Sequence, residues 1–193
     1  MEQSFADNET YDKIDFKKEH LKKGDYENCV FNHCDFSKTD LSEVKFIGCE
    51  FTGCNLTLVK TNGTVFHDCR FRDCKMLGLR FDNCSKFGLA FSFENCILDH
   101  SSFYETKTRK TVLKNCHLRE VDFTDCDMES AIFDNCNLAD AKFENTVLVK
   151  ADLRSSYNYS IDPETNKIKK AKFSLKGVAG LLEKYDIEIE GSH

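Results

Sequence analysis

The feature of this sequence that most constrains its fold is a five-residue period of large apolar side chains. Counting by fives through residues 16–81 meets a large apolar residue at every step except Thr61, and a second series through 93–153 does so at every step except Thr108. A period of five fits neither the 3.6-residue turn of an α-helix nor the two-residue alternation of a β-strand. The backbone must therefore turn once in every five residues.

The residue two places before most of the large centres is small or β-branched, and all eleven cysteines fall at this position of the quintet. The other three places of each quintet are mostly polar, so we expect two side chains in five to face a core. Four near-right-angle turns close a square coil of 20 residues, and stacked coils can pair at about 4.8 Å, the ordinary interstrand distance. Three sets of cysteines recur at this interval: Cys29, Cys49 and Cys69; Cys34, Cys54 and Cys74; Cys96, Cys116 and Cys136.

Individual quintets also resemble those of a known family. Cys136-Asn137-Leu138-Ala139-Asp140 followed by Ala141-Lys142-Phe143-Glu144-Asn145 is similar to the repeats of the pentapeptide-repeat proteins. The resemblance covers roughly residues 12–173 and implies an all-β solenoid, a right-handed quadrilateral β-helix. In such a solenoid each quintet contacts only its neighbours.

The same pattern divides the chain. We interpret residues 1–11 as a lead-in, 12–173 as the β-helix and 174–190 as a C-terminal cap. The period slips by two residues near 84–92, which we interpret as a seam between two halves of one rod. The last three residues, 191–193, are a candidate tag remnant.

The C-terminal segment changes period. Leu175, Val178, Leu181, Leu182 and Tyr185 recur at helical spacing, and Ile187 and Ile189 alternate as in a short strand. A capping helix is expected because an open solenoid end exposes unpaired edges. The segment acts either as a cap alone or as a cap that also forms a two-fold dimer. Ser160-Ile161-Asp162-Pro163, Ala171-Lys172-Phe173-Ser174-Leu175 and Leu181-Leu182 with Asp186-Ile187 resemble the tail of the Qnr and McbG proteins. That resemblance implies that the seven apolar residues of the segment form a homodimer interface.

No catalytic, cofactor or metal site is predicted. Structural zinc sites use ligand pairs two to four residues apart, whereas these cysteines are spaced mostly by multiples of five. His33 adjoins Cys34 and His117 adjoins Cys116, but neighbouring side chains on extended backbone point to opposite sides. Phosphate-binding, dinucleotide-binding and zinc-protease motifs are absent from the sequence. We therefore expect a protein that is not an enzyme.

The distribution of charged residues is the surface property that the sequence shows most directly. The net charge is −6, and residues 116–153 hold three Lys and Arg against nine Asp and Glu. These nine candidate surface acids are Glu120, Asp122, Asp125, Asp127, Glu129, Asp134, Asp140, Glu144 and Asp152. Nucleic acid would be repelled, because binding it relies on Lys and Arg to neutralise phosphates. A rod about as wide as a duplex with regular carboxylates could instead imitate DNA.

The family resemblance implies such a role. Its Qnr-type members engage DNA gyrase and topoisomerase IV and protect them from quinolones or peptide toxins. Many of them carry projecting loops, but here residues 46–56 and 103–113 run through without an insertion. The alternative is a structural or adaptor solenoid with a different protein partner. No apolar run approaches the roughly 20 residues of a membrane span, and no secretory signal precedes the repeat, so a cytoplasmic location is expected.

Overall fold

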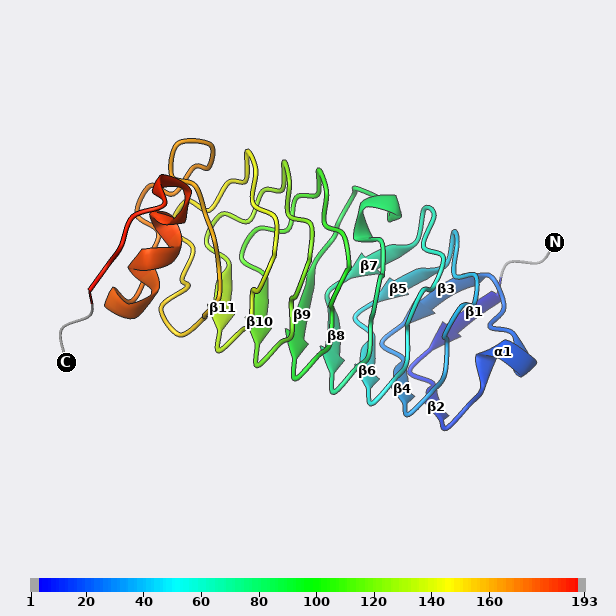
Figure 1. The fold of residues 1–193 in the computed structure, drawn as a ribbon. Helices are drawn as coiled ribbons and strands as arrows, with labels where there is room; N and C mark the ends of the chain where they lie inside the picture. Colours follow the sequence, from blue (N-terminus) through cyan, green and yellow to red (C-terminus); the bar gives the residue numbers. More distant parts are fainter. Residues whose placement is uncertain (1–3, 191–193) are drawn as a thin grey trace.

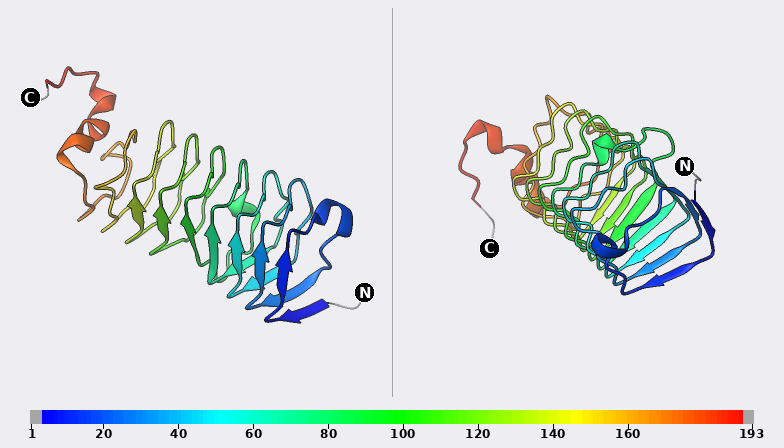
Figure 2. Two further views of the ribbon diagram at one scale, coloured as in Figure 1. Left: turned by 90° about the horizontal axis from the view of Figure 1, so that it is seen from below. Right: turned by 90° about the vertical axis from the view of Figure 1, so that its right-hand side faces the viewer.

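The computed structural model describes residues 4–190 and consists of coils stacked along one axis (Figure 1). Each coil turns four times, and its strands pair in parallel with those of the coils above and below. Figure 2 shows the resulting rod from below and towards one end. The predicted all-β solenoid is therefore confirmed. No helix within residues 4–190 has the length and apolar character needed to cross a membrane.

Two sides of the rod are regular parallel sheets. Face 1 holds four strands: β1 (Ser4–Asp7), β3 (Gly24–Glu27), β5 (Lys45–Ile47) and β7 (Val65–His67). Face 2 holds seven: β2 (Thr10–Asp12), β4 (Val30–Asn32), β6 (Glu50–Thr52), β8 (Cys69–Arg72), β9 (Phe91–Glu94), β10 (Val112–Lys114) and β11 (Ile132–Asp134). Because β1 and β2 already pair with the next coil, residues 4–11 of the expected lead-in belong to the first coil.

Faces 3 and 4 follow in chain order and are joined by isolated parallel bridges. Face 3 contains the bridge between Asp15 and Asp35, and face 4 that between Asp40 and Lys60. The residue after each face turns the chain in a left-handed conformation, with a positive φ near 55° at Asn95, Asn115 and many equivalent residues. We call this residue, two places after each apolar centre, the corner position. Asn and Asp suit it because they tolerate this conformation better than most residues.

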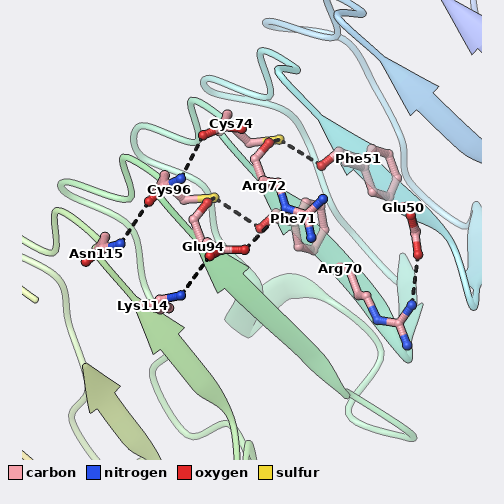
Figure 3. Close-up of polar contacts among 12 residues, drawn as sticks. Glu50, Phe51, Arg70, Phe71, Arg72, Cys74, Glu94, Cys96, Lys114 and Asn115 are labelled. Atoms are coloured by element: carbon pink, nitrogen blue, oxygen red, sulfur yellow. Dashed lines mark hydrogen bonds and ion pairs between the residues drawn. The ribbon is translucent and has the colours of Figure 1, made fainter. Parts of the chain in front are cut away.

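The apolar centres and cysteines fill the interior. Phe31, Phe51 and Phe71 are fully or almost fully buried, and their rings stack one above another. All eleven cysteines are buried and free. Figure 3 shows the Sγ atoms of Cys74 and Cys96 donating to the carbonyls of Phe51 and Phe71, each at 3.4 Å. Eight of the eleven sulfur atoms bond in this way to the backbone of the preceding coil.

The two-residue slip appears as a change of register. Face 2 pairs residues 20 apart except at β8 and β9, where Phe71 pairs with Phe93. A 3₁₀ helix, η1 (Phe81–Asn83), precedes the extra residues. Lys86 stands where an apolar centre is due and is exposed, so the buried side chains of Leu89 and Phe91 occupy the interior there instead. Phe87 projects from this loop with 89% of its surface exposed.

The two breaks in the apolar period are buried and hydrogen-bonded. The Thr61 hydroxyl donates to the carbonyl of Arg80 at 2.5 Å. The Thr108 hydroxyl lies 3.6 Å from the sulfur of Cys126. Each hydroxyl thereby has a partner, which removes most of the penalty of burying it in an apolar column.

The ends differ from the regular coils. A short helix, α1 (Phe16–Glu19), lies near the N-terminus, and two 3₁₀ helices, η2 (Leu175–Leu181) and η3 (Glu183–Tyr185), close the C-terminus. The helical spacing of the tail therefore forms tight turns rather than an α-helix, consistent with two glycines in η2. Residues 187–189 form no strand in the described part of the tail, where no neighbouring strand pairs with them. The candidate tag remnant lies outside the described residues.

Candidate functional site

The surface acids of the C-terminal half are divided among the four faces. Six of them lie on face 4 or on the corners at its two edges: Glu105, Glu120, Asp122, Asp125, Asp140 and Glu144. We call this group the acidic face. Five of its members are among the nine acids predicted from the sequence, and Glu105 is an addition. Glu105 lies 20 residues before Asp125, so counting by coils along the sequence would have found it.

Backbone register fixes the positions within the acidic face. Asp122 is bridged to Ser102 on one side and to Lys142 on the other. The amide of Asp125 donates to the carbonyl of Glu144 at 2.8 Å, which places these two acids in neighbouring coils. Asp140 occupies a left-handed corner with φ of 58°, as do Asp125 and Glu120 with similar angles. Corner side chains point outward, so these carboxylates are presented to solvent.

Few cations neutralise the acidic face. Asp125, Asp140 and Glu144 are exposed and have no cationic side chain within 4 Å among residues 4–190. Glu120 lies 3.2 Å from a ring nitrogen of His100. Glu105 is paired with Lys86 at 3.2 Å, and the hydrogen bonds from Tyr104 and then Lys86 lower its pKa. Lys142 also lies on this face, bridged to Asp122.

The other four predicted acids lie elsewhere and are mostly compensated. Asp127 and Glu129 belong to face 1, where Arg109 lies 2.7 Å from the first and 3.5 Å from the second. Asp134 and Asp152 belong to face 2, and Arg154 lies 2.7 Å from Asp152. The hydrogen bond from Arg154 lowers the pKa of Asp152.

Face 2 carries alternating charges instead of a field of one sign. Glu94 accepts hydrogen bonds from Arg72 at 3.2 Å and from Lys114 at 3.0 Å, so three neighbouring coils are linked by ion pairs (Figure 3). Along the next corner, Asn115 donates to Asn95 at 3.1 Å. These ladders stabilise the stack and leave little net charge on this side of the rod.

The tail presents an apolar surface at the end of the rod. Leu175 is 91% exposed, and Val178, Tyr185, Ile187 and Ile189 are also exposed, whereas Leu181 and Leu182 are partly buried. A hollow of about 370 Å³ lies here, lined by Ala179, Gly180, Leu182, Glu183, Asp186, Ile187 and Ile189. All seven residues predicted for a dimer interface therefore lie in one segment, and five of them are exposed.

Lys184 attaches the tail to the last coil. Its ammonium lies 2.7 Å from Asp162 and 2.6 Å from Glu164. The backbone amide of Ile161 donates to the carbonyl of Gly180 at 2.9 Å. The apolar surface is thus held in a defined place by one ion cluster and one backbone contact.

In the two neighbouring His–Cys pairs, the side chains point to opposite sides of the chain. His33 and His117 are exposed while Cys34 and Cys116 are buried, as the extended backbone predicts. Within residues 4–190 no three His, Cys, Asp or Glu side chains are grouped to hold a metal ion. The surfaces described above are therefore the candidate functional sites.

Comparisons with known proteins identify the repeat. Two family models match: Pentapeptide repeats (8 copies) at residues 27–57 and 49–85, and Pentapeptide repeat region at 80–153. A search of curated proteins found no match.

Solved structures share the fold. Trypsin-treated QnrB1, a plasmid-mediated fluoroquinolone resistance protein, has a TM-score of 0.62 and 18% identity, covering 98% of this chain and 100% of that one. Full-length QnrB1 has a TM-score of 0.48 at 18% identity, with coverage of 95% and 100%. HetL, a pentapeptide repeat protein involved in heterocyst differentiation regulation from Nostoc sp. strain PCC 7120, has a TM-score of 0.38 at 15% identity, with coverage of 91% and 86%. Together the two models span residues 27–153, and the chain belongs to the pentapeptide-repeat proteins.

Proposed function

We propose that this protein binds a type II topoisomerase, DNA gyrase or topoisomerase IV, by presenting its acidic face in place of DNA. Bound in this way it modulates the enzyme and changes its response to quinolones or peptide toxins. The protein acts by binding and performs no chemistry of its own. The observation that carries the proposal is the density of uncompensated carboxylates on the acidic face, and the likeness to QnrB1 in fold is consistent with it.

The acidic face has about half the charge density of DNA. Its six carboxylates occupy three successive coils, but Lys86 pairs with Glu105 and Lys142 lies on the same face, which leaves four net negative charges. Three coils span about 14 Å at the ordinary interstrand spacing, which gives one net negative charge per roughly 3.6 Å of rod. B-DNA carries one per about 1.7 Å of helix axis. A groove that binds duplex DNA through Lys and Arg would therefore meet a field of the same sign along this side of the rod.

A supercoiling assay with purified gyrase tests the proposal. The protein is titrated with and without ciprofloxacin, and compared with the triple variant Glu120→Lys, Asp125→Lys, Asp140→Lys. All three are corner positions, and lysine already occupies the equivalent corner at Lys110 and Lys150. The matched control is Glu43→Lys, Asp68→Lys, Asp73→Lys, which makes the same charge change at corners of the N-terminal half: Asp68 and Asp73 lie on other edges of the rod, and Glu43 lies three coils before Glu105.

We expect wild type and the control to change supercoiling or the inhibition by ciprofloxacin, and the acidic-face variant to lose most of that effect. Charge reversal replaces attraction to a basic groove by repulsion. If the acidic-face variant acts like wild type, DNA imitation by this face is wrong even where binding persists. If wild type has no effect at any concentration, topoisomerase modulation is wrong.

The tail supports a second part of the proposal, a homodimer formed through Leu175, Val178, Leu181, Leu182, Tyr185, Ile187 and Ile189. An exposed apolar patch of this kind is typical of a protein contact. A two-fold dimer would place two acidic faces on one longer rod. Light scattering at defined concentrations measures the mass directly, and a monomer throughout would contradict this part.

Phe87 favours the alternative function, an adaptor for another protein. A fully projecting aromatic ring has no counterpart in a phosphate backbone, whereas aromatic anchors are common in protein interfaces. Affinity capture from the native host, with wild type and Phe87→Ala compared, tests this reading. A protein enriched by wild type and lost with Phe87→Ala supports it. Capture of gyrase subunits alone, unchanged by the substitution, contradicts it.

A further inference from the structure

Face 1 beyond the seam has the opposite charge to the acidic face. Its outward and corner positions carry seven cations: Lys107, Arg109, Lys110, Lys150, Lys167, Lys169 and Lys170. We call this group the basic strip. Asp127 and Glu129 are the acids within it. A strongly basic side on a chain with a net charge of −6 requires explanation.

The coil register aligns the basic strip along the rod axis. Lys107 is bridged to Asp127, Asp127 to Val147, and Val147 to Lys167. The amide of Lys150 donates to the carbonyl of Lys169 at 3.0 Å, which aligns the adjoining row. The four coils lie on one side of the molecule, with the cations in the first, third and fourth of them and the two acids in the second.

Most of its positive charge is uncompensated. Arg109 is engaged by Asp127 and Glu129, and Lys150 lies 3.4 Å from Glu129. The other five lysines are exposed, and none has an acidic side chain within 4 Å in the described part of the chain: Lys107, Lys110, Lys167, Lys169 and Lys170. The two acids of the strip thus pair with two of its cations, and the five unpaired lysines remain available to an external ligand.

A hollow lies at the seam end of the strip. It measures about 430 Å³, and its lining includes Arg70, Ser92, Arg109, Lys110 and Thr111. Asp68 also lines it, and Arg70 is paired with Glu50 at 2.8 Å. Residues of β8 and β9, the strands between which the register changes by two, form part of its lining. It offers a polar recess into which the end of a bound segment can fit.

The neighbouring faces limit what the strip can bind. On one side, Asp125 and Glu144 belong to the acidic face. A nucleic-acid duplex about as wide as the rod would overhang this side and bring its phosphates against those carboxylates, which is unfavourable. An extended polypeptide is narrow enough to stay on one face. At about 3.3 Å per residue, four to five residues span the three coil steps from Lys107 to Lys167.

From these observations we propose that the basic strip is a docking surface for an extended, acidic segment of a partner protein. Carboxylates at one end of the segment pair with Lys167, Lys169 and Lys170, and those at the other end pair with Lys107 and Lys110, where the segment enters the hollow. The proposal does not depend on the topoisomerase function, because the strip and the acidic face are different sides of the rod.

Fluorescence anisotropy with a labelled 12-residue peptide of alternating Glu and Ser tests the proposal, at low and at physiological salt. The test variant is Lys167→Glu, Lys169→Glu, Lys170→Glu. Glutamate already occupies the corner equivalent to Lys170 at Glu105 and Glu120, so the backbone tolerates the change. The control variant is Lys38→Glu, Lys60→Glu, Lys75→Glu, which alters net charge equally with exposed lysines on faces 3 and 4. A Lys→Gln version of the test variant serves if the Glu version does not fold.

We expect wild type to bind the peptide and the test variant to bind it at least about tenfold more weakly, while the control changes affinity less than about twofold. Binding should weaken as salt rises, because exposed charges are screened. If both variants lose the same peptide affinity, the loss is due to net charge alone and the proposal is wrong. An absence of binding by wild type up to about 1 mM peptide would also overturn the proposal. Tighter binding of a 12-nucleotide single strand than of the peptide would assign the strip to nucleic acid and also overturn it.

Discussion

The rings of Phe51 and Phe71 stack nearly parallel, with their centroids 4.9 Å apart and their planes 16° from each other. Phe31 continues the stack on the other side of Phe51 at 4.8 Å. The centroid spacing matches the distance between neighbouring coils. Ring packing and backbone pairing therefore have the same repeat, and each stabilises the geometry that the other requires.

Replacing a ring in this stack should be costly. We expect Phe51→Ala to lower the free energy of unfolding by about 3–5 kcal/mol, because it removes buried surface and leaves a cavity between two rings. Phe87→Ala is the matched control, and its exposed ring should contribute less than about 0.5 kcal/mol. Urea unfolding measures both. Similar values for the two variants would contradict the buried column.

The cysteines should be unreactive in the folded protein. Burial raises the pKa of the Cys49 and Cys84 thiols to about 12 and that of Cys126 to about 11, so little thiolate exists at pH 8. Since the thiolate is the reactive form, we expect slow modification by a disulfide reagent under native conditions. In denaturant all eleven thiols should react. Rapid modification of several thiols in the native state would show that the interior is open.

The tail should loosen in acid. Lys184 lowers the pKa of Asp162 and of Glu164 through hydrogen bonds, so both carboxylates bind protons less readily when folded. Their stabilising effect is complete above their ordinary pKa values of 3.8 and 4.5 and is lost as the pH falls through the lowered values. We expect Lys184→Ala to speed amide exchange in η3 at pH 7 and to make no difference once the pH is below the lowered pKa values of both carboxylates. A difference that persists unchanged in strong acid would contradict this assignment.

Gly180 should be essential for packing the tail against the last coil. A Cβ atom at this position would lie 2.0 Å from the carbonyl oxygen of Tyr159, which is backbone and cannot move aside. We expect Gly180→Ala to displace the tail and, if the proposed dimer exists, to give a monomer by light scattering with the rod still folded. Lys176→Ala, an exposed position in η2, is the control. A Gly180→Ala protein with unchanged mass and tail protection would show that the tail is not fixed by this contact.

The interior could be predicted from the sequence because the five-residue period determines which side chains point inward. The stacking of Phe31 on Phe51 and the burial of every cysteine follow directly from the 20-residue interval. The slip was also visible as a change of phase. What the sequence did not indicate is that Phe91 would fill the interior in place of Lys86, because that substitution depends on the path of the extra residues.

The surface was harder to predict. A run of acids along the sequence looks like one patch, but each quintet turns the chain to another side of the rod. Asp122 and Asp127 are therefore close in sequence yet lie on faces 4 and 1. The basic strip was hidden for the same reason, since its lysines are spread over 64 residues, from 107 to 170. Tail geometry also depended on local crowding around Tyr159, which no periodicity reveals.

The left-handed corners have a consequence for how such a protein can diversify. Asn115, Glu120, Asp125, Ser130 and Lys150 all adopt nearly the same positive φ, so one backbone geometry accepts side chains of either sign or none. A single codon change at a corner can thus reverse the local charge while the coil beneath it stays the same. Related rods can therefore acquire new binding partners much faster than they change shape.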